Sequence, residues 1–214
     1  MSYHRFLEWI PSTLLPLCLY LQHCCGDCCG VSFIDSTSLN VCHHCRIDRH
    51  QVFQGLAAWG KASVDCFFGL KLHLVVNAPG ELLNLTVTPG NVDDRRPVPE
   101  LLRPLFGKVF ANRGYVSQPL AAQLLQDYGI EFFAKPQRNM KNRLMRLQDK
   151  LLTRKCCLIK TIIDQPKNIS QIEHSRHCLL VVNCFAHLFC GLIAYLNRPK
   201  KPGLDLDDEL TATA

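Results

Sequence analysis

The chain has 214 residues, of which 48% are hydrophobic and 20% are charged, and its mean hydropathy is +0.03. These values exclude a disordered chain and a protein with many membrane spans, and the length suits one domain with at most a short appendage. The net charge is +6, but residues 135–160 carry nine basic side chains against one acid, so the rest of the chain sums to −2. Such a block indicates a polyanionic partner, with a solvated helix face as the alternative.

The first predicted elements in chain order are strands. Residues 31–36 form a short run rich in strand-forming residues. Residues 67–77 and 81–88 alternate between two sets of side chains, as strands with one buried face do. The segment Asn77-Ala-Pro-Gly80 between them has the composition of a turn, so we expect an antiparallel hairpin.

Helices and strands alternate in the second part of the chain. In order, we expect a helix at Pro97–Phe106 that Asp94 could cap, a strand at Lys108–Ala111, a turn at Gly114, a helix at Pro119–Tyr128 and a strand at Ile130–Ala134. A long cationic helical stretch and an apolar C-terminal helix complete the layers. This order predicts an α/β fold with a mixed sheet flanked by helices.

The cysteines and the apolar segments bear on location. Thirteen cysteines form an odd and large set for a secreted disulfide framework, and the apolar N-terminus contains a glutamate and two prolines without a signal-peptide cleavage site. We therefore expect a cytoplasmic protein with reduced thiols. Residues 178–196 lack charged side chains and are nearly long enough to cross a bilayer, but Asn183 and His187 share one helical face, which favours a helix lying on a soluble core.

Two cysteine pairs have the spacing of a zinc ligand set. Cys25 and Cys28 precede Cys42 and Cys45 by thirteen intervening residues, and four thiolates can surround zinc tetrahedrally. Against zinc, the residues between the pairs resemble a buried strand, and Cys24 and Cys29 are in excess of the four ligands that such a site needs. A zinc-ribbon protein therefore remains an alternative.

Six segments in a fixed order resemble those of bacterial insertion-sequence transposases with a DDE catalytic domain. These segments are Phe33-Ile-Asp-Ser-Thr37, Gly69-Leu-Lys-Leu-His-Leu74, Thr88-Pro-Gly-Asn-Val-Asp-Asp-Arg95, Gly114-Tyr115, Asn139-Met-Lys-Asn142 and Ile169-Ser-Gln-Ile-Glu-His-Ser-Arg-His177. The resemblance covers roughly residues 3 to 203, and the ordered set is more specific than any one segment.

The resemblance implies an RNase H-like fold in which two Asp and one Glu hold two Mg²⁺ ions for phosphodiester cleavage and strand transfer. Asp35, in the middle of the first strand, matches the first of these acids, and the alternative is a buried Asp satisfied by backbone N–H groups. The second position, shortly before Gly114-Tyr115, reads Asn112, and the third, on a late helix, reads Lys160.

These two replacements remove the negative charge that metal binding needs. Three carboxylates carry −3, whereas Asp35, Asn112 and Lys160 sum to zero. An ammonium about 4 Å from a divalent ion costs roughly twice the unit-charge value of about 4 kcal/mol at an effective dielectric of 20. We therefore expect Mg²⁺ binding to be lost and Lys160 to form an ion pair with Asp35. Asp164 lies about 6 Å further along the helix axis and has a shorter side chain than Glu, so it is a poor substitute.

DNA remains the expected partner, since phosphate contacts tolerate the loss of a metal site. The candidate contacts are Lys71, Arg95, Arg113, Lys141, Arg143, His174 and Arg176. For His174 and Arg176, a capped helix start is the alternative. Asp93 and Asp94 are expected in a structural or DNA-contacting loop rather than as a ligand pair.

We expect residues 1–30 to be an N-terminal helical remnant, residues 31–203 to form the RNase H-like domain and residues 204–214 to be a disordered acidic tail. Pro166 lies where the helix carrying Lys160 would continue, and it costs on the order of 3 kcal/mol unless the helix ends there. Together these features indicate a truncated, decayed transposase that no longer catalyses transposition. The alternatives are a DNA-binding regulator that pairs with an intact transposase or forms a homo-oligomer, and the zinc-ribbon protein.

Overall fold

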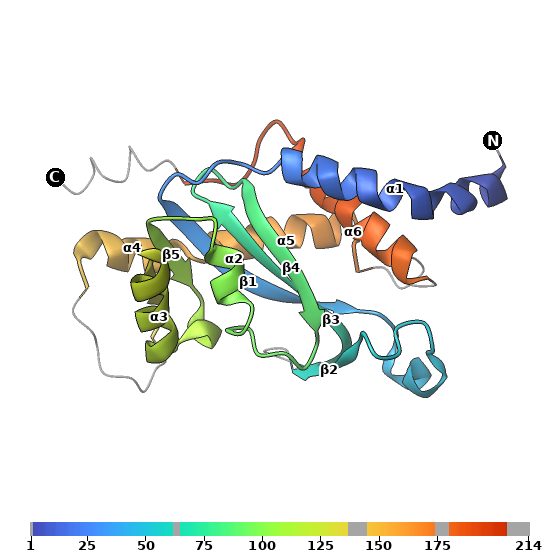
Figure 1. Ribbon diagram of the computed structural model, residues 1–214, viewed down its shortest axis with the longest axis horizontal. Helices are drawn as coiled ribbons and strands as arrows, with labels where there is room; N and C mark the ends of the chain where they lie inside the picture. The colour runs from blue at the N-terminus through green and yellow to red at the C-terminus, as the bar shows by residue number, and fades with distance from the viewer. Residues whose placement is uncertain (1, 62–64, 137–144, 174–179, 205–214) are drawn as a thin grey trace.

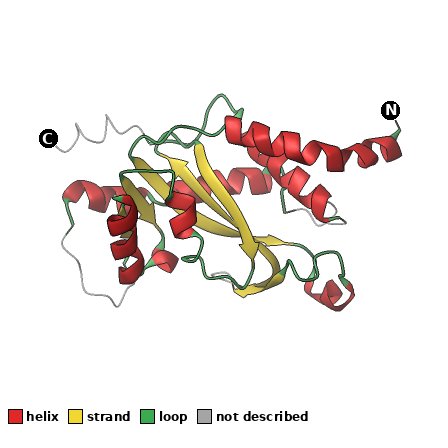
Figure 2. Cartoon of the chain, in the orientation of Figure 1, coloured by secondary structure: helices red, strands yellow, loops and turns green. Residues whose placement is uncertain are grey.

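A six-stranded sheet with helices on both faces forms the frame of the protein (Figure 1, Figure 2). The computed structural model describes residues 2–61, 65–136, 145–173 and 180–204. The strands are β1 (Val31–Asn40), β2 (Ala58–Lys61), β3 (Cys66–Asn77), β4 (Leu82–Pro89), β5 (Lys108–Ala111) and β6 (Glu131–Ala134). The helices are α1 (Tyr3–His23), α2 (Val98–Leu102), α3 (Gln118–Tyr128), α4 (Leu147–Lys155), α5 (Leu158–Asn168) and α6 (Val181–Leu196), with short 3-10 helices η1 (His44–Arg49) and η2 (Arg113–Tyr115).

The strand β1 has an antiparallel neighbour on one side and a parallel neighbour on the other. β3 runs antiparallel to β1 from the pair Ser32 and Asn77 to the pair Asn40 and Gly69, and both β2 and β4 pair with β3. β5 pairs in parallel with β1, and β6 pairs in parallel with β5. This mixed sheet flanked by helices confirms the predicted RNase H-like α/β class.

The predicted hairpin forms between β3 and β4. Asn77 closes its turn, because the side-chain carbonyl accepts a hydrogen bond from the Glu81 N–H (2.7 Å) and the Asn77 N–H donates to the Glu81 carbonyl (3.0 Å). Gly80 has a φ of +86°, which glycine adopts without strain, and a Cβ there would collide with the carbonyl oxygen of Pro202. The turn thus depends on local conformation and on a contact with the far end of the chain.

Alternating side chains of β1 point into two separate cores. Phe33 and Leu39 belong to a core that includes residues of α5, α6 and the end of α1, whereas Ile34 belongs to a second core with α2 and α3. Asp35 is two residues from Phe33 and shares its face, so its carboxylate points toward the layer of α5. The sheet therefore places one acid at the edge of an apolar core.

Two predicted element boundaries are wrong. β1 continues to Asn40, beyond the predicted end at Ser36, because its last residues pair with β3. The helix expected at Pro97–Phe106 is the short α2, because Pro104 has no N–H with which to continue the helical hydrogen-bond ladder.

The long cationic helical stretch that we expected after β6 is divided in the structure. Its described residues form two helices, α4 and α5, and residues 137–144 lie outside the described ranges. Pro166 does not end α5, which continues to Asn168. A proline in the last turn removes only one helical hydrogen bond, and its ring is buried, so packing offsets part of that loss.

The helix α1 lies against α6, and its N-terminal part extends beyond the sheet (Figure 1). α6 is the predicted apolar C-terminal helix, and it buries Leu188 and Leu192 in the core that also contains Leu21 of α1. Among the residues that the structure describes, no helix is both long enough and apolar enough to cross a membrane.

Candidate functional site

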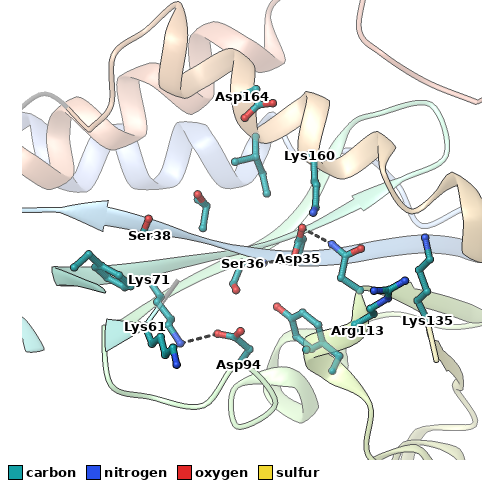
Figure 3. A pocket seen from close by; sticks show the side chains of 16 residues that line it. Asp35, Ser36, Ser38, Lys61, Lys71, Asp94, Arg113, Lys135, Lys160 and Asp164 are labelled. Atoms are coloured by element: carbon teal, nitrogen blue, oxygen red, sulfur yellow. Dashed lines mark hydrogen bonds and ion pairs between the residues drawn. The ribbon is translucent and has the colours of Figure 1, made fainter. Parts of the chain in front are cut away.

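A pocket of about 620 Å³ opens beside the middle of β1, and we call it the Asp35 pocket (Figure 3). Asp35, Asn112 and Lys160 all line it. The sheet register explains the first two, because Ile34 pairs with Ala111 on parallel strands and the next residue of each strand therefore lies at the same level. Lys160 comes from the first turn of α5, which packs over this face of the sheet.

Asn112 donates a hydrogen bond to Asp35. The distance from Nδ2 of Asn112 to Oδ2 of Asp35 is 2.5 Å, and the Ser36 N–H donates to Oδ1 of Asp35 at 3.0 Å. Asp35 is only 9% exposed, and this burial raises its pKa to about 6 although Ser36, Lys160 and Asn112 each act to lower it. Both oxygens of the buried carboxylate therefore already accept hydrogen bonds from the protein.

Lys160 points from α5 toward Asp35 in Figure 3, but the expected ion pair does not form. No salt bridge within 4.0 Å joins Lys160 to Asp35, both of which the structure describes. The side chain of Lys160 is exposed. Asn112 and Ser36 occupy the carboxylate oxygens that such a pair would use. Lys160 acts on Asp35 at longer range, where its charge helps to lower the pKa of the carboxyl group.

Asp94 lines the opposite side of the Asp35 pocket and is held by a lysine of β3. Lys71 Nζ lies 2.9 Å from Oδ1 of Asp94 and donates a second hydrogen bond to the Val92 carbonyl at 2.9 Å. Asp94 therefore does not cap α2, whose first turn follows Pro97 without a side-chain cap. The negative charge of Asp94 also acts to raise the pKa of Asp35.

Three further basic side chains line the Asp35 pocket. Arg113 of η2 was expected as a DNA contact, whereas Lys61 at the end of β2 and Lys135 after β6 were not singled out as site residues. The signal for Lys135 in the sequence was its position directly after the predicted strand Ile130–Ala134. In the structure Ala134 pairs with Ala111 on parallel strands, so the residues that follow them lie at the same edge of the sheet. Nothing near Lys61 in the sequence indicated that β2 ends beside Asp35.

A family model of the transposase DDE domain matches residues 25–180. The chain belongs to this family. No curated protein and no solved structure matches the chain. DDE-domain transposases act on DNA and generally use a divalent metal such as Mg²⁺, so the Asp35 pocket has to be judged against that metal and that substrate.

The Asp35 pocket of this DDE-domain transposase does not fit a pair of Mg²⁺ ions. Mg²⁺ requires oxygen ligands, but Asn112 turns its N–H₂ group toward Asp35, and Lys160 brings an ammonium to the same space. Asp94 is neutralised by Lys71 of β3, and Asp164 lies one turn beyond Lys160 on α5 and is exposed. Within the described ranges, no three His, Cys, Asp or Glu side chains converge as a metal site.

Of the candidate DNA contacts that the structure describes, Lys71 and Arg113 line the Asp35 pocket, whereas Arg95 does not. Arg95 is exposed and binds Asp93 of its own loop through two hydrogen bonds of 2.8 and 2.5 Å, which lower the pKa of Asp93 to about 2. Arg113 lies at the Asp35 pocket, and Lys71 is engaged by Asp94. The other four candidates, Lys141, Arg143, His174 and Arg176, lie outside the described residues.

The two cysteine pairs lie at opposite ends of β1. Cys25 and Cys28 come before Val31, and Cys42 and Cys45 follow Asn40. Ten strand residues at about 3.3 Å each separate the pairs by roughly 30 Å, too far for four thiolates to share one zinc ion. The zinc-ribbon alternative is therefore not supported.

Proposed function

We propose that this DDE-domain transposase binds DNA but does not catalyse phosphodiester transfer. The observation that carries the proposal is the hydrogen bond from Asn112 to Asp35, because Asn112 is a donor at the position where catalysis would need a second metal-binding carboxylate. The family supplies the substrate class, and the side chains of the Asp35 pocket supply the reason for inactivity.

The charge at the three positions argues against metal binding. A carboxylate at position 112 would repel Asp35 at this distance unless a cation lay between them, which is how paired carboxylates favour metal ions. The neutral amide removes the need for a cation, because it satisfies Asp35 directly. Lys160 then adds a positive charge that a divalent ion would have to approach.

The test is a nicking assay on supercoiled plasmid with Mg²⁺ or Mn²⁺. We expect no nicking by the unmodified protein, and metal-dependent nicking by the variant with Asn112→Asp and Lys160→Glu together. The control is the same double variant carrying Asp35→Asn, which should be inactive because the first carboxylate is then lost. Metal-dependent nicking by the unmodified protein, abolished by Asp35→Asn, would refute the proposed inactivity.

DNA binding is tested separately from cleavage. We expect a labelled duplex to bind in a strongly salt-dependent way, with a slope of log K against log salt of about −0.9 for each phosphate contacted. Arg113→Glu should weaken binding, whereas Arg103→Glu, the same change at an exposed residue of a separate pocket beside α2, is the matched control. The absence of any complex at low ionic strength would overturn this part of the proposal.

A bound but inactive domain would compete with an intact transposase for the ends of a mobile element. The regulator that we considered from the sequence is thus a consequence of the proposed function. Co-expression of this chain should lower the transposition frequency of an active element whose ends it binds, and the lowering should be lost in the variant that no longer binds DNA.

A further inference from the structure

Four basic side chains line the Asp35 pocket without a carboxylate partner among the described residues. They are Lys61, Arg113, Lys135 and Lys160. In the described part of the chain, no salt bridge within 4.0 Å joins any of them to an acid, whereas Lys71 in the same pocket is neutralised by Asp94. The four come from β2, η2, the end of β6 and α5, so the fold and not the local sequence brings them together.

The Asp35 pocket therefore carries a net positive charge. It is lined by five basic and three acidic side chains, which leaves +2 when all are ionised. Of the acids, Asp94 is paired and Asp35 accepts hydrogen bonds from Asn112 and Ser36. A cavity with one excess sign of charge and apolar wall residues such as Phe67 concentrates the opposite ion.

Three of the cations lie around Asp35. In the view of Figure 3, Arg113 and Lys135 lie on the same side of Asp35, and Lys160 points from α5 toward Asp35. Arg offers a planar fork of N–H donors and Lys a compact ammonium, and both bind phosphate oxygens. A volume of about 620 Å³ lies within the range of ordinary ligand sites and admits such a group.

We propose that the Asp35 pocket binds one phosphate group of the DNA backbone directly, through Lys160, Arg113 and Lys135, without a divalent cation. The proposal rests on the proposed DNA binding and names its site. In this pocket the ammonium of Lys160 supplies the positive charge that Mg²⁺ would otherwise supply to the phosphate. Added Mg²⁺ should then weaken the complex by competing for the phosphate, and a chelator should leave it intact.

The experiment measures the anisotropy of a labelled DNA duplex with the full chain, in EDTA and in Mg²⁺ at matched ionic strength. Lys160→Gln should weaken binding about tenfold in EDTA, the effect of losing one charged hydrogen bond, and should reduce the salt slope by about one contact. Lys200→Gln is the control, because it makes the same change at an exposed residue after α6, outside the pocket and outside the basic block 135–160. We expect the control to bind within about twofold of the unmodified protein.

A second readout uses inorganic phosphate alone. Phosphate should raise the midpoint of thermal unfolding of the unmodified protein and of Lys200→Gln, but not of Lys160→Gln, and circular dichroism of each variant checks that it is folded. Equal DNA affinities for Lys160→Gln and Lys200→Gln would overturn this inference and leave the proposed DNA binding standing. Failure of the unmodified protein to bind DNA at low ionic strength would overturn both.

Discussion

Replacing Asn112 with Asp should destabilise the protein in a way that depends on pH. The substitution exchanges the N–H₂ group that lies 2.5 Å from Oδ2 of Asp35 for a second carboxylate oxygen. The pair loses a hydrogen bond to a charged group, and two negative charges face each other in a buried position.

The size of the effect follows from the distance. Two unit charges about 3 Å apart at an effective dielectric of 20 repel by about 5 kcal/mol. The variant can avoid this repulsion by keeping one proton on the pair, which costs about 1.4 kcal/mol for each pH unit above the ordinary carboxyl pKa, or about 4 kcal/mol at pH 7. We therefore expect Asn112→Asp to lower the free energy of unfolding by about 4 kcal/mol at pH 7 and by about 1 kcal/mol at pH 5.

Urea unfolding at pH 5, 6, 7 and 8, followed by circular dichroism, measures this difference. Asn112→Ala is the matched control, because it removes the donor without adding a charge and should show a smaller loss. Adding Lys160→Glu to Asn112→Asp should make the stability respond to Mg²⁺, since a cation then relieves the repulsion. A deficit for Asn112→Asp that does not grow as the pH rises would show that Asp35 and residue 112 do not interact as described.

Three further predictions concern buried titratable side chains and can be tested by the same unfolding measurements. Burial raises the pKa of Asp35 to about 6, so the folded state holds the proton more tightly than the unfolded state and stability falls as the pH rises from about 4 to about 6. Asp35→Asn should therefore be about 3 kcal/mol more stable than the unmodified protein at pH 8, and the gain should vanish below about pH 4. Burial lowers the pKa of His73 to about 4, so the protein should lose about 3 kcal/mol between pH 6.5 and 4, and His73→Gln should lose less. Asp149 is 3% exposed and binds Lys108 at 2.6 Å, so Asp149→Ala should cost about 3 kcal/mol at neutral pH, and an unchanged midpoint would contradict the pairing.

Local chemistry in the sequence was enough to predict much of the sheet. The turn at Asn77-Ala-Pro-Gly80 and the alternation on either side predicted the hairpin of β3 and β4, and Lys108–Ala111 was predicted with the bounds that the structure has. These features depend on neighbours in the chain, so propensity and periodicity report them. The resemblance of the ordered motifs to the transposase family likewise aligned positions 112 and 160 with the second and third acids of that family, so the replacements could be predicted from the sequence.

Contacts between distant segments decided the rest. The sequence suggested that Lys160 would pair with Asp35. In the structure the parallel register of β1 and β5 puts Asn112 beside the carboxylate, and Asn112 donates the hydrogen bond instead. The full length of β1 separated the cysteine pairs, and the end of β2 brought Lys61 to the same pocket. Residue types fix which charges a chain carries, whereas packing fixes which of those charges are close enough to neutralise one another, and it is packing that gives the Asp35 pocket its excess of basic side chains.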